Sequence, residues 1–421
     1  MSTSLHPHAR RRAPVAVALV ALWFAPGPLP ARADAITLDD AVARALAGAP
    51  ELARAQALRT AASERAASAA QLPDPELLLG LDNVPIEGDD AGSLGADFMT
   101  MRRIGLMQRF EGAGQRRAGQ AAADAGVALR DAATDSQRAA LARAAAQAWL
   151  DWALACARVE LLAGQRPRYE MHVASADARV AAGGGVVDGI AARRELAEFE
   201  ARLDAARGLR DEAAAALSRW LGERVEGEPA ALPEVDALPD EAGDATSAAL
   251  PEIIEGQRRV ERASALAESA RLERRPDWSL EASYNDRGSQ YDDMVTLGVR
   301  IDLPVRASAR QDREYAARLA ERDAAEAQLE QRRRERDGEL EALRARWRSA
   351  GARVARYQAT IEPLARAEAE AALAAYRGGG GDLADAVDAT HSAERASLDA
   401  LDAVADQASA WVALRYLLPE S

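Results

Sequence analysis

The sequence is poor in several features on which compact globular proteins and enzymes rely. Cysteine occurs once, as Cys156, which excludes an internal disulfide, and lysine is absent. Only 4% of residues are aromatic while 29% are charged, and alanine dominates the apolar content, a composition typical of long helices packed at close range. Motifs for a nucleophile elbow, a phosphate-binding loop or a zinc protease are also missing, so we expect neither an enzyme nor a cofactor.

Long apolar runs are missing beyond the N-terminus, where no stretch reaches the roughly 18 residues of a membrane-spanning helix. Residues 1–35 combine three consecutive arginines, an apolar stretch and small residues before a cleavage site, which predicts a secretory signal. An uncleaved anchor is the alternative, although three prolines interrupt the end of the stretch. The net charge of −14 becomes more negative once these arginines are removed, so nucleic acid is not expected as a partner.

The sequence contains an internal repeat. Matched residues, first copy against second, are Pro50 and Pro251, Glu51 and Glu252, Gln56 and Gln257, Ser63 and Ser264, Pro75 and Pro276, Pro167 and Pro363, and Gly183, Gly184 and Gly185 with Gly379, Gly380 and Gly381. An offset of about 200 residues indicates a duplicated unit rather than a short solenoid repeat. We therefore divide the chain after the signal into residues 36–236 and residues 237–421.

Each repeat contains a pair of segments in which apolar and polar residues alternate. We predict strands over residues 76–84 and 98–110 in the first repeat and over 277–285 and 294–303 in the second. The second pair alternates regularly over a length that suits a transmembrane β-strand, whereas Leu78 interrupts the pattern in the first. Soluble hairpins that cap a helical bundle are the alternative. Four strands cannot close a barrel in a membrane, so three copies, with twelve strands, are expected.

Long polar helices make up the rest of each repeat. Expected helices cover residues 112–182 and 308–377, with antiparallel returning helices over residues 191–221 and 386–417. At 1.5 Å per residue each long helix would measure about 100 Å, several times the diameter of a domain. Pro167 and Pro363 predict a kink or a short break at matching places. A soluble antiparallel coiled coil would explain these helices alone, without the strand pairs.

Short motifs at the borders of these elements resemble those of a known family. They are Leu38 to Val42, Ala49 to Leu52, Leu72 to Pro75, Phe110 to Gly112, and Asp302 to Pro304. In their duplicated order they resemble the TolC-like outer-membrane efflux proteins. The resemblance implies a mainly α-helical fold that forms a homotrimer, with a twelve-stranded β-barrel in the outer membrane and a long α-helical tunnel across the periplasm. Residues 81–83 and 99–102 look most like the metal-exporting, CzcC-like branch.

By this resemblance the protein is a passive export duct for heavy-metal cations, surrounded by outer-membrane lipid. Its partners would be a periplasmic adaptor protein and an inner-membrane pump of the RND type. The adaptor is expected at the two helix-reversal tips, residues 183–189 and 378–384, which contain the matched glycines. Two alternatives stay open: a drug-efflux or type I secretion channel of the same fold, and a soluble periplasmic coiled-coil adaptor or scaffold.

Asp385 and Asp388 match the family segment whose two aspartates ring the periplasmic entrance of the tunnel. In a trimer the resemblance implies six carboxylates around a narrow opening, which would attract cations and oppose anions. The alternative is a solvated helix start, where acidic residues are favourable.

Four further residues near the tips bear on the gate or on metal binding. Asp188 and Tyr376 fall where the resemblance places a tether of the closed entrance, whereas Gly381 stands where the family has an arginine. His391 is a lone histidine beside acidic residues, and we interpret it as an ordinary surface residue. Without a cysteine or a second histidine at ligand spacing, no metal site is expected.

Overall fold

The computed structural model describes residues 35–183, 185–238 and 246–417, so the predicted signal lies almost entirely outside the described residues. The helices are α1 (Leu38–Gly48), α2 (Pro50–Ala69), α3 (Gln115–Ala181), α4 (Val186–Leu221), α6 (Pro251–Leu272), α7 (Gln311–Arg356), α8 (Glu362–Arg377) and α9 (Leu383–Arg415). The strands are β1 (Glu76–Asp82), β2 (Met101–Phe110), β3 (Trp278–Asp286) and β4 (Met294–Ile301). These elements follow the order predicted from the repeat.

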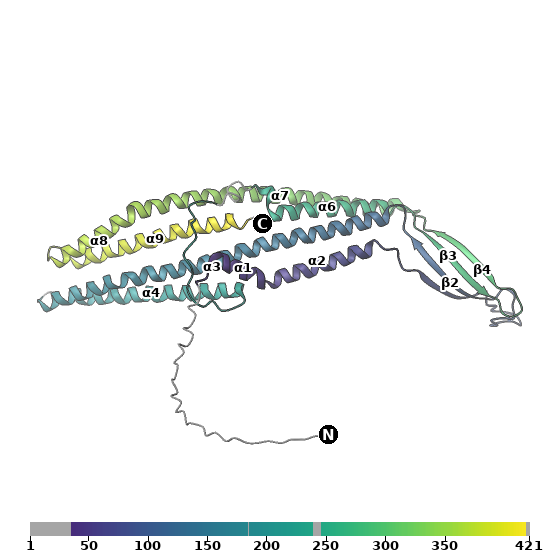
Figure 1. The fold of residues 1–421 in the computed structure, drawn as a ribbon, viewed down its shortest axis with the longest axis horizontal. Helices are drawn as coiled ribbons and strands as arrows, with labels where there is room; N and C mark the ends of the chain where they lie inside the picture. Colours follow the sequence, from purple (N-terminus) through teal and green to yellow (C-terminus); the bar gives the residue numbers. More distant parts are fainter. Residues whose placement is uncertain (1–34, 184, 239–245, 418–421) are drawn as a thin grey trace, which may run out of the picture. The chain divides into compact units, whose positions relative to one another are not determined.

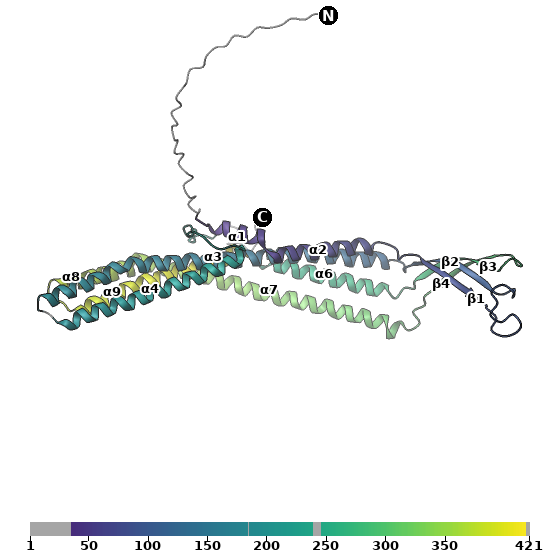
Figure 2. The same cartoon turned by 90° about the horizontal axis from the view of Figure 1, so that it is seen from below.

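The helices form two long hairpins. Helix α3 packs against α4, and α7 and α8 pack against α9, while α2 and α6 both lie along the half of α3 nearer the sheet (Figures 1 and 2). The buried positions of α3 and α9 are mostly alanines, whose small side chains let helix axes approach closely. The sheet lies at one end of the helical hairpins and the two glycine turns lie at the other (Figure 1).

The matching prolines behave differently in the two hairpins. Helix α3 continues through Pro167 without interruption, so the predicted break is wrong there. Tyr169 and Phe199 stack with ring centroids 4.4 Å apart, which supports the turn that follows the proline. In the second hairpin a π-helical turn, Tyr357–Ile361, separates α7 from α8, and Pro363 follows two residues later in the first turn of α8.

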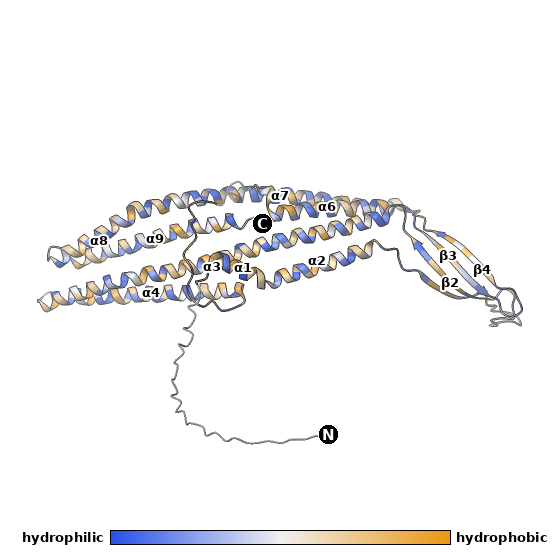
Figure 3. Ribbon diagram, viewed as in Figure 1, coloured by the Kyte–Doolittle hydropathy of each residue, from blue (hydrophilic) through white to orange (hydrophobic). Residues whose placement is uncertain are grey.

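The four strands form one antiparallel sheet in the order β1-β2-β3-β4. The strand predictions hold to within about three residues at each end, the usual uncertainty of element boundaries. Expected strand residues 98–100 belong instead to the preceding loop, where the Met99 amide donates to the Asp97 carboxylate at 2.6 Å. Hydrophilic and hydrophobic residues alternate along the strands (Figure 3).

One face of the sheet is apolar and exposed. A row across all four strands joins Leu79, Ile104, Tyr284 and Val295, and their exposed fractions run from 46% to 71%. The opposite face is mostly polar, and its β3 residues Ser279, Ser283 and Asn285 are buried, with Asn285 only 3% exposed. This is the reverse of a sheet that covers the core of a water-soluble protein, where the apolar face is buried.

Three tryptophans hold two crossing segments onto the middle of the helices. The indole N–H groups of Trp347 and Trp411 donate to the carbonyl oxygens of Val235 and Ala237, at 2.8 and 2.9 Å. The third is fully buried Trp149, which donates to the carbonyl oxygen of Ile36 at 2.9 Å. These bonds satisfy buried indole donors and fix the chain where the repeats connect. None of the described helices has an apolar stretch long enough to span a membrane.

Candidate functional site at the hairpin tips

Each hairpin reverses at a glycine in the left-handed conformation, Gly183 with φ +91° and Gly379 with φ +77°. A residue without a Cβ takes this conformation readily, which explains the glycines that the two repeats share. In the second tip, the N–H of Gly380 donates to the carbonyl of Ala375 at 3.0 Å, and a Cβ on Gly381 would lie 3.2 Å from the Ala375 Cβ. Gly185 precedes α4, and Gly184 lies outside the described residues.

Asp385 and Asp388 lie in the first two turns of α9 and are both exposed. Their spacing places them on one face of the helix, while Leu383, Ala386 and Val387 are buried on the other. Neither carboxylate forms a hydrogen bond or ion pair with any side chain that the structure describes. Both charges therefore face solvent in the single chain, as a role at an entrance requires, and the ring that they would form stays a prediction.

Tyr376 is fully buried in the tip core rather than exposed beside Asp188. The guanidinium of Arg179, on α3, lies 4.4 Å from the centroid of its ring, and its hydroxyl has no hydrogen-bond partner among the described residues. Asp188 is half-buried in the first turn of α4. The two residues are not bonded to each other within the described chain, and the tether of the closed entrance stays a prediction.

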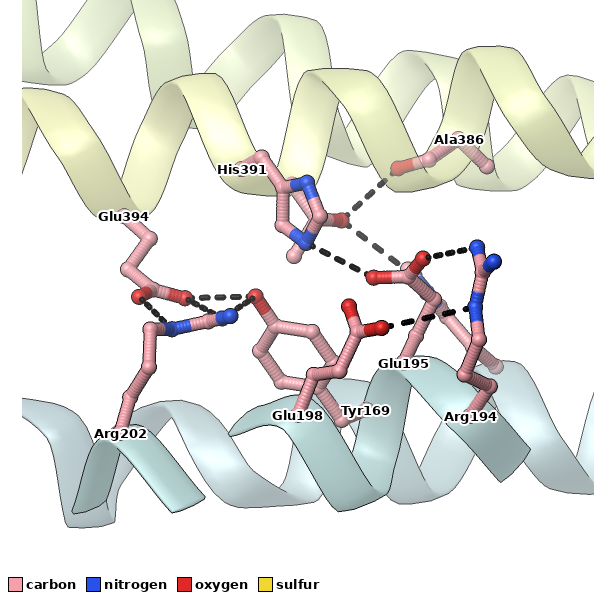
Figure 4. A network of polar contacts seen from close by, with 10 residues as sticks. Tyr169, Arg194, Glu195, Glu198, Arg202, Ala386, His391 and Glu394 are labelled. Carbon is pink, nitrogen blue, oxygen red and sulfur yellow. Dashed lines mark hydrogen bonds and ion pairs between the residues drawn. The ribbon is translucent and has the colours of Figure 1, made fainter. Parts of the chain in front are cut away.

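An ion pair with a buried carboxylate joins the two hairpins farther from the tips (Figure 4). Glu394 of α9 is 5% exposed, and its carboxylate accepts from the Tyr169 hydroxyl at 2.5 Å and lies 3.3 Å from Nε of Arg202. Arg202 also donates to the Tyr169 oxygen at 3.1 Å. Three groups from α3, α4 and α9 thus satisfy one another, with Glu394 and Tyr169 buried and the Arg202 side chain 41% exposed.

A second set of polar groups lies beside this ion pair, toward the tips. His391 is half-buried, and its Nε2 lies 3.3 Å from a carboxylate oxygen of Glu195, which also pairs with Arg194 at 3.0 Å (Figure 4). The interpretation of His391 as a surface residue is therefore wrong: an i, i+3 spacing places it with Glu394 on the α9 face that meets the other hairpin. Among the described residues, no group of three or more histidine, cysteine, aspartate and glutamate side chains could hold a metal ion.

No protein-family model and no curated protein matches the sequence. Solved structures do match: CusC has 18% identity and a TM-score of 0.77, covering 91% of this chain and 92% of that one. VceC of Vibrio cholerae has 19% identity and a TM-score of 0.76, covering 91% and 96%. The open state of MtrE of Neisseria gonorrhoeae has 17% identity and a TM-score of 0.69, covering 91% and 88%.

The chain has a TolC-like fold. The fold class predicted from the duplicated sequence is thereby confirmed, since the likeness extends over nearly the whole length of each structure. In this TolC-like fold the buried polar groups lie between the two hairpins of one chain. Burial and the hydrogen bond to Glu394 raise the pKa of the Tyr169 phenol, which stays protonated and acts as a donor.

His172 of α3 adds a pH-dependent contact between the hairpins of the TolC-like fold. It is 1% exposed, and its Nε2 lies 3.3 Å from the Thr390 hydroxyl. That hydroxyl already donates to the Ala386 carbonyl, so the imidazole Nε2 is the donor here. Its Nδ1 has no partner among the described residues, and a proton added there would be buried without an acceptor.

We expect this histidine to make the helical hairpins less stable as the pH falls. Burial lowers the pKa of His172, and the charges of His391 and Arg377 lower it further, against the opposing effect of Glu195. The folded chain favours neutral His172. The stability that this residue contributes is therefore complete above the ordinary histidine pKa of 6.5 and is lost as the pH falls below that value.

Thermal unfolding of the wild type and of His172→Gln, between about pH 7.5 and pH 5, measures this effect. The wild type should lose more stability than the variant over this interval. Parallel pH dependences would contradict the assignment to His172.

Proposed function

We propose that the protein is the outer-membrane channel of a tripartite efflux system and forms a passive export duct as a homotrimer. The observation that carries the proposal is the exposed apolar face of the sheet, together with two edges, β1 and β4, that have no partner strand within the described chain. A bilayer would cover such a face, and open edges in hydrocarbon are too costly to persist. Pairing β4 of one copy with β1 of the next satisfies both requirements.

The TolC-like fold supports this proposal. OprN and CmeC of Campylobacter jejuni, whose solved structures also match, are described as outer-membrane channels. A soluble periplasmic adaptor or scaffold is disfavoured because it would leave the apolar face of the sheet in water. The signal predicted for residues 1–35 would direct the chain to the periplasm and outer membrane.

A periplasmic adaptor protein and an inner-membrane pump of the RND type complete the proposed system. The first tip offers a surface suited to protein contact, because Val186, Val187 and Ile190 of α4 are 61% to 76% exposed. Exposed apolar groups of this size at a helix end are unfavourable in water and favour a protein partner. We propose that the adaptor contacts this tip and the glycine turn of the second hairpin.

Heavy-metal cations are the proposed cargo, on the basis of the CzcC-like motifs and of the exposed carboxylates at the second tip. Drug efflux and type I secretion by the same kind of duct are the alternatives, since a passive channel need not bind what it conducts. Deletion of the protein is expected to raise sensitivity to divalent metals more than sensitivity to dyes and antibiotics. Unchanged metal tolerance in the deletion strain would favour the alternatives.

Cell fractionation tests the channel itself. The protein should be recovered with outer membranes and should migrate as a trimer that heating converts to a monomer. Recovery as a soluble monomer would refute the channel and favour the adaptor or scaffold.

Removing the two exposed carboxylates, in the double variant Asp385→Ala with Asp388→Ala, is expected to weaken cation selectivity and cation block of single-channel conductance by about tenfold. The reason is the loss of six charges from a narrow opening in the trimer. The matched control is Glu368→Ala with Glu370→Ala, which removes the same charge from two exposed positions of α8 in the same hairpin. Equal conductance and block in both double variants would show that the carboxylate ring is misplaced.

A further inference from the structure

The two hairpins meet near the tips through a small apolar cluster and through polar groups. Ala386, Leu383 and Val387 of α9 pack in one cluster with Ala176 of α3 and Ala192 of α4. The alanines of this cluster bury little apolar area, so they contribute little to holding the hairpins together. The ion pair of Arg202 with Glu394, closed by the Tyr169 hydroxyl, adds a polar contact across this seam in which the carboxylate is buried. We call these three residues the lock.

The internal repeat allows the three lock positions to be compared with the equivalent positions of the other repeat. The spacing that matches Pro167 with Pro363 also matches Glu394 with Glu198, so the acidic residue of the lock occurs in both repeats. The two donor residues of the lock, Tyr169 and Arg202, occur only in the first repeat. Ala365 stands at the position of Tyr169, and Leu398 stands at the position of Arg202.

Among the described residues of the single chain, Glu198 lacks such donors from another helix. It is exposed, and its carboxylate lies 3.6 Å from Nε of Arg194, one turn away on the same helix (Figure 4). Such an exposed i, i+4 pair contributes little to stability, whereas a buried carboxylate that loses its two partners would be left without compensation for its charge. The two repeats thus carry the same acid in a buried, partnered form and in an exposed, weakly partnered form.

We propose that Tyr169, Arg202 and Glu394 lock the two hairpins of one chain together, whereas the equivalent seam between neighbouring chains has no lock, so the tunnel tip opens between chains. This inference rests on the proposed trimer. In an assembly of three duplicated chains, the repeat creates two kinds of seam, one within a chain and one between chains. At the second kind, α8 and α9 of one copy meet α4 of the next, where Glu198 faces alanine and leucine positions instead of tyrosine and arginine.

Hydrogen exchange on the purified trimer tests the lock. Glu394→Gln removes the buried charge and leaves Arg202 without its counter-ion, so amides within residues 165–176 and 386–398 should exchange at least about tenfold faster. The matched control is Glu198→Gln, which changes the same position of the other repeat and should leave these amides unchanged. Equal exchange in the two variants would overturn the lock.

Spin labels at Ala182 and Ala384, exposed residues of the two tips, test where the tip opens. The labelled cysteines are introduced in a Cys156→Ala background, and dilution with unlabelled chains isolates the distance within one chain. The distribution of that distance should be narrow in the wild type and broad in Glu394→Gln. A single label at Ala384 on each chain reports the distance between chains, and the distribution of this distance should be broad in both proteins.

Two results would count against the proposal. A broad distance within the wild-type chain, or a narrow one between chains in a conducting trimer, would overturn opening between chains. Heat-modifiable migration and single-channel conductance are recorded on the same samples. Absence of a trimer or of conductance would refute the proposed function itself. If the trimer conducts but Glu394→Gln and Glu198→Gln show the same hydrogen exchange and the same distance distributions, only the lock would be refuted.

Discussion

Replacing Leu297 by arginine is expected to prevent the protein from accumulating in the outer membrane. Leu297 lies in the middle of β4, is 76% exposed, and continues a row with Ala282, Leu106 and Leu77 on the apolar face of the sheet. An arginine on the lipid face of a barrel costs roughly 2–4 kcal/mol at the bilayer midplane, and a trimer would contain three of them. Cell fractionation and heat-modifiable migration measure the outcome.

The neighbouring residue provides the control, because adjacent side chains of a strand point to opposite faces. Thr296 pairs with Ser283 on the polar face, where Arg103 and Arg300 already lie. Thr296→Arg should therefore reach the membrane as a trimer. If both arginine variants assembled equally well, the apolar face would not be in contact with lipid, and the proposed barrel would lose its main support.

Strand alternation was sufficient to predict the sheet. In β3, and in β4 from Val295 onward, apolar residues alternate with polar residues or glycine, and this period of two indicates a strand with two different faces. The pattern could not say which face is exposed, because that depends on what surrounds the sheet rather than on its order of residues. The structure adds the pairing of β2 with β3, which joins the strand pairs of the two repeats into one sheet.

The polar groups between the hairpins could not be predicted in the same way. Tyr169 and Glu394 are 225 residues apart in the chain. The local sequence around His391 does not indicate that this face of the helix contacts a second hairpin. A usable signal was present in the alanines that surround Glu394, since small residues on one helix face indicate close packing there. An acidic residue on such a face requires a partner from another helix.

The two repeats differ in their long helices and at their tips. The first hairpin has a long uninterrupted helix with Pro167 inside it, whereas the second has a π-helical turn before Pro363. Turns of this kind concentrate at functional sites because they relax the regular hydrogen-bonding pattern. The same hairpin carries Asp385 and Asp388. Duplication thus supplies the framework, and departures from it are concentrated in the hairpin that we propose forms the entrance.

The second large effect is expected at the middle of the helices, where Trp149→Ala should reduce the free energy of unfolding by about 3–5 kcal/mol. Trp149 is fully buried among the residues of α1, α3 and α9, so its removal leaves a large cavity. It also removes one of two hydrogen bonds to the Ile36 carbonyl, which still accepts from the Ala230 N–H in the backbone bridge between Ile36 and Pro229. Guanidinium unfolding of the purified protein, followed by tryptophan fluorescence and circular dichroism, measures the loss.

Two further variants separate the cavity from the hydrogen bond. Trp149→Phe retains much of the ring volume and removes the indole donor, so most of its cost should come from the lost hydrogen bond and the remaining gap, about 1–2 kcal/mol. Trp220→Ala alters a half-buried tryptophan at the edge of the same cluster and should cost less than Trp149→Ala. Equal losses for Trp149→Ala and Trp220→Ala would mean that the centre of the cluster does not hold the two repeats together, because a fully enclosed cavity must cost more than one that solvent can fill.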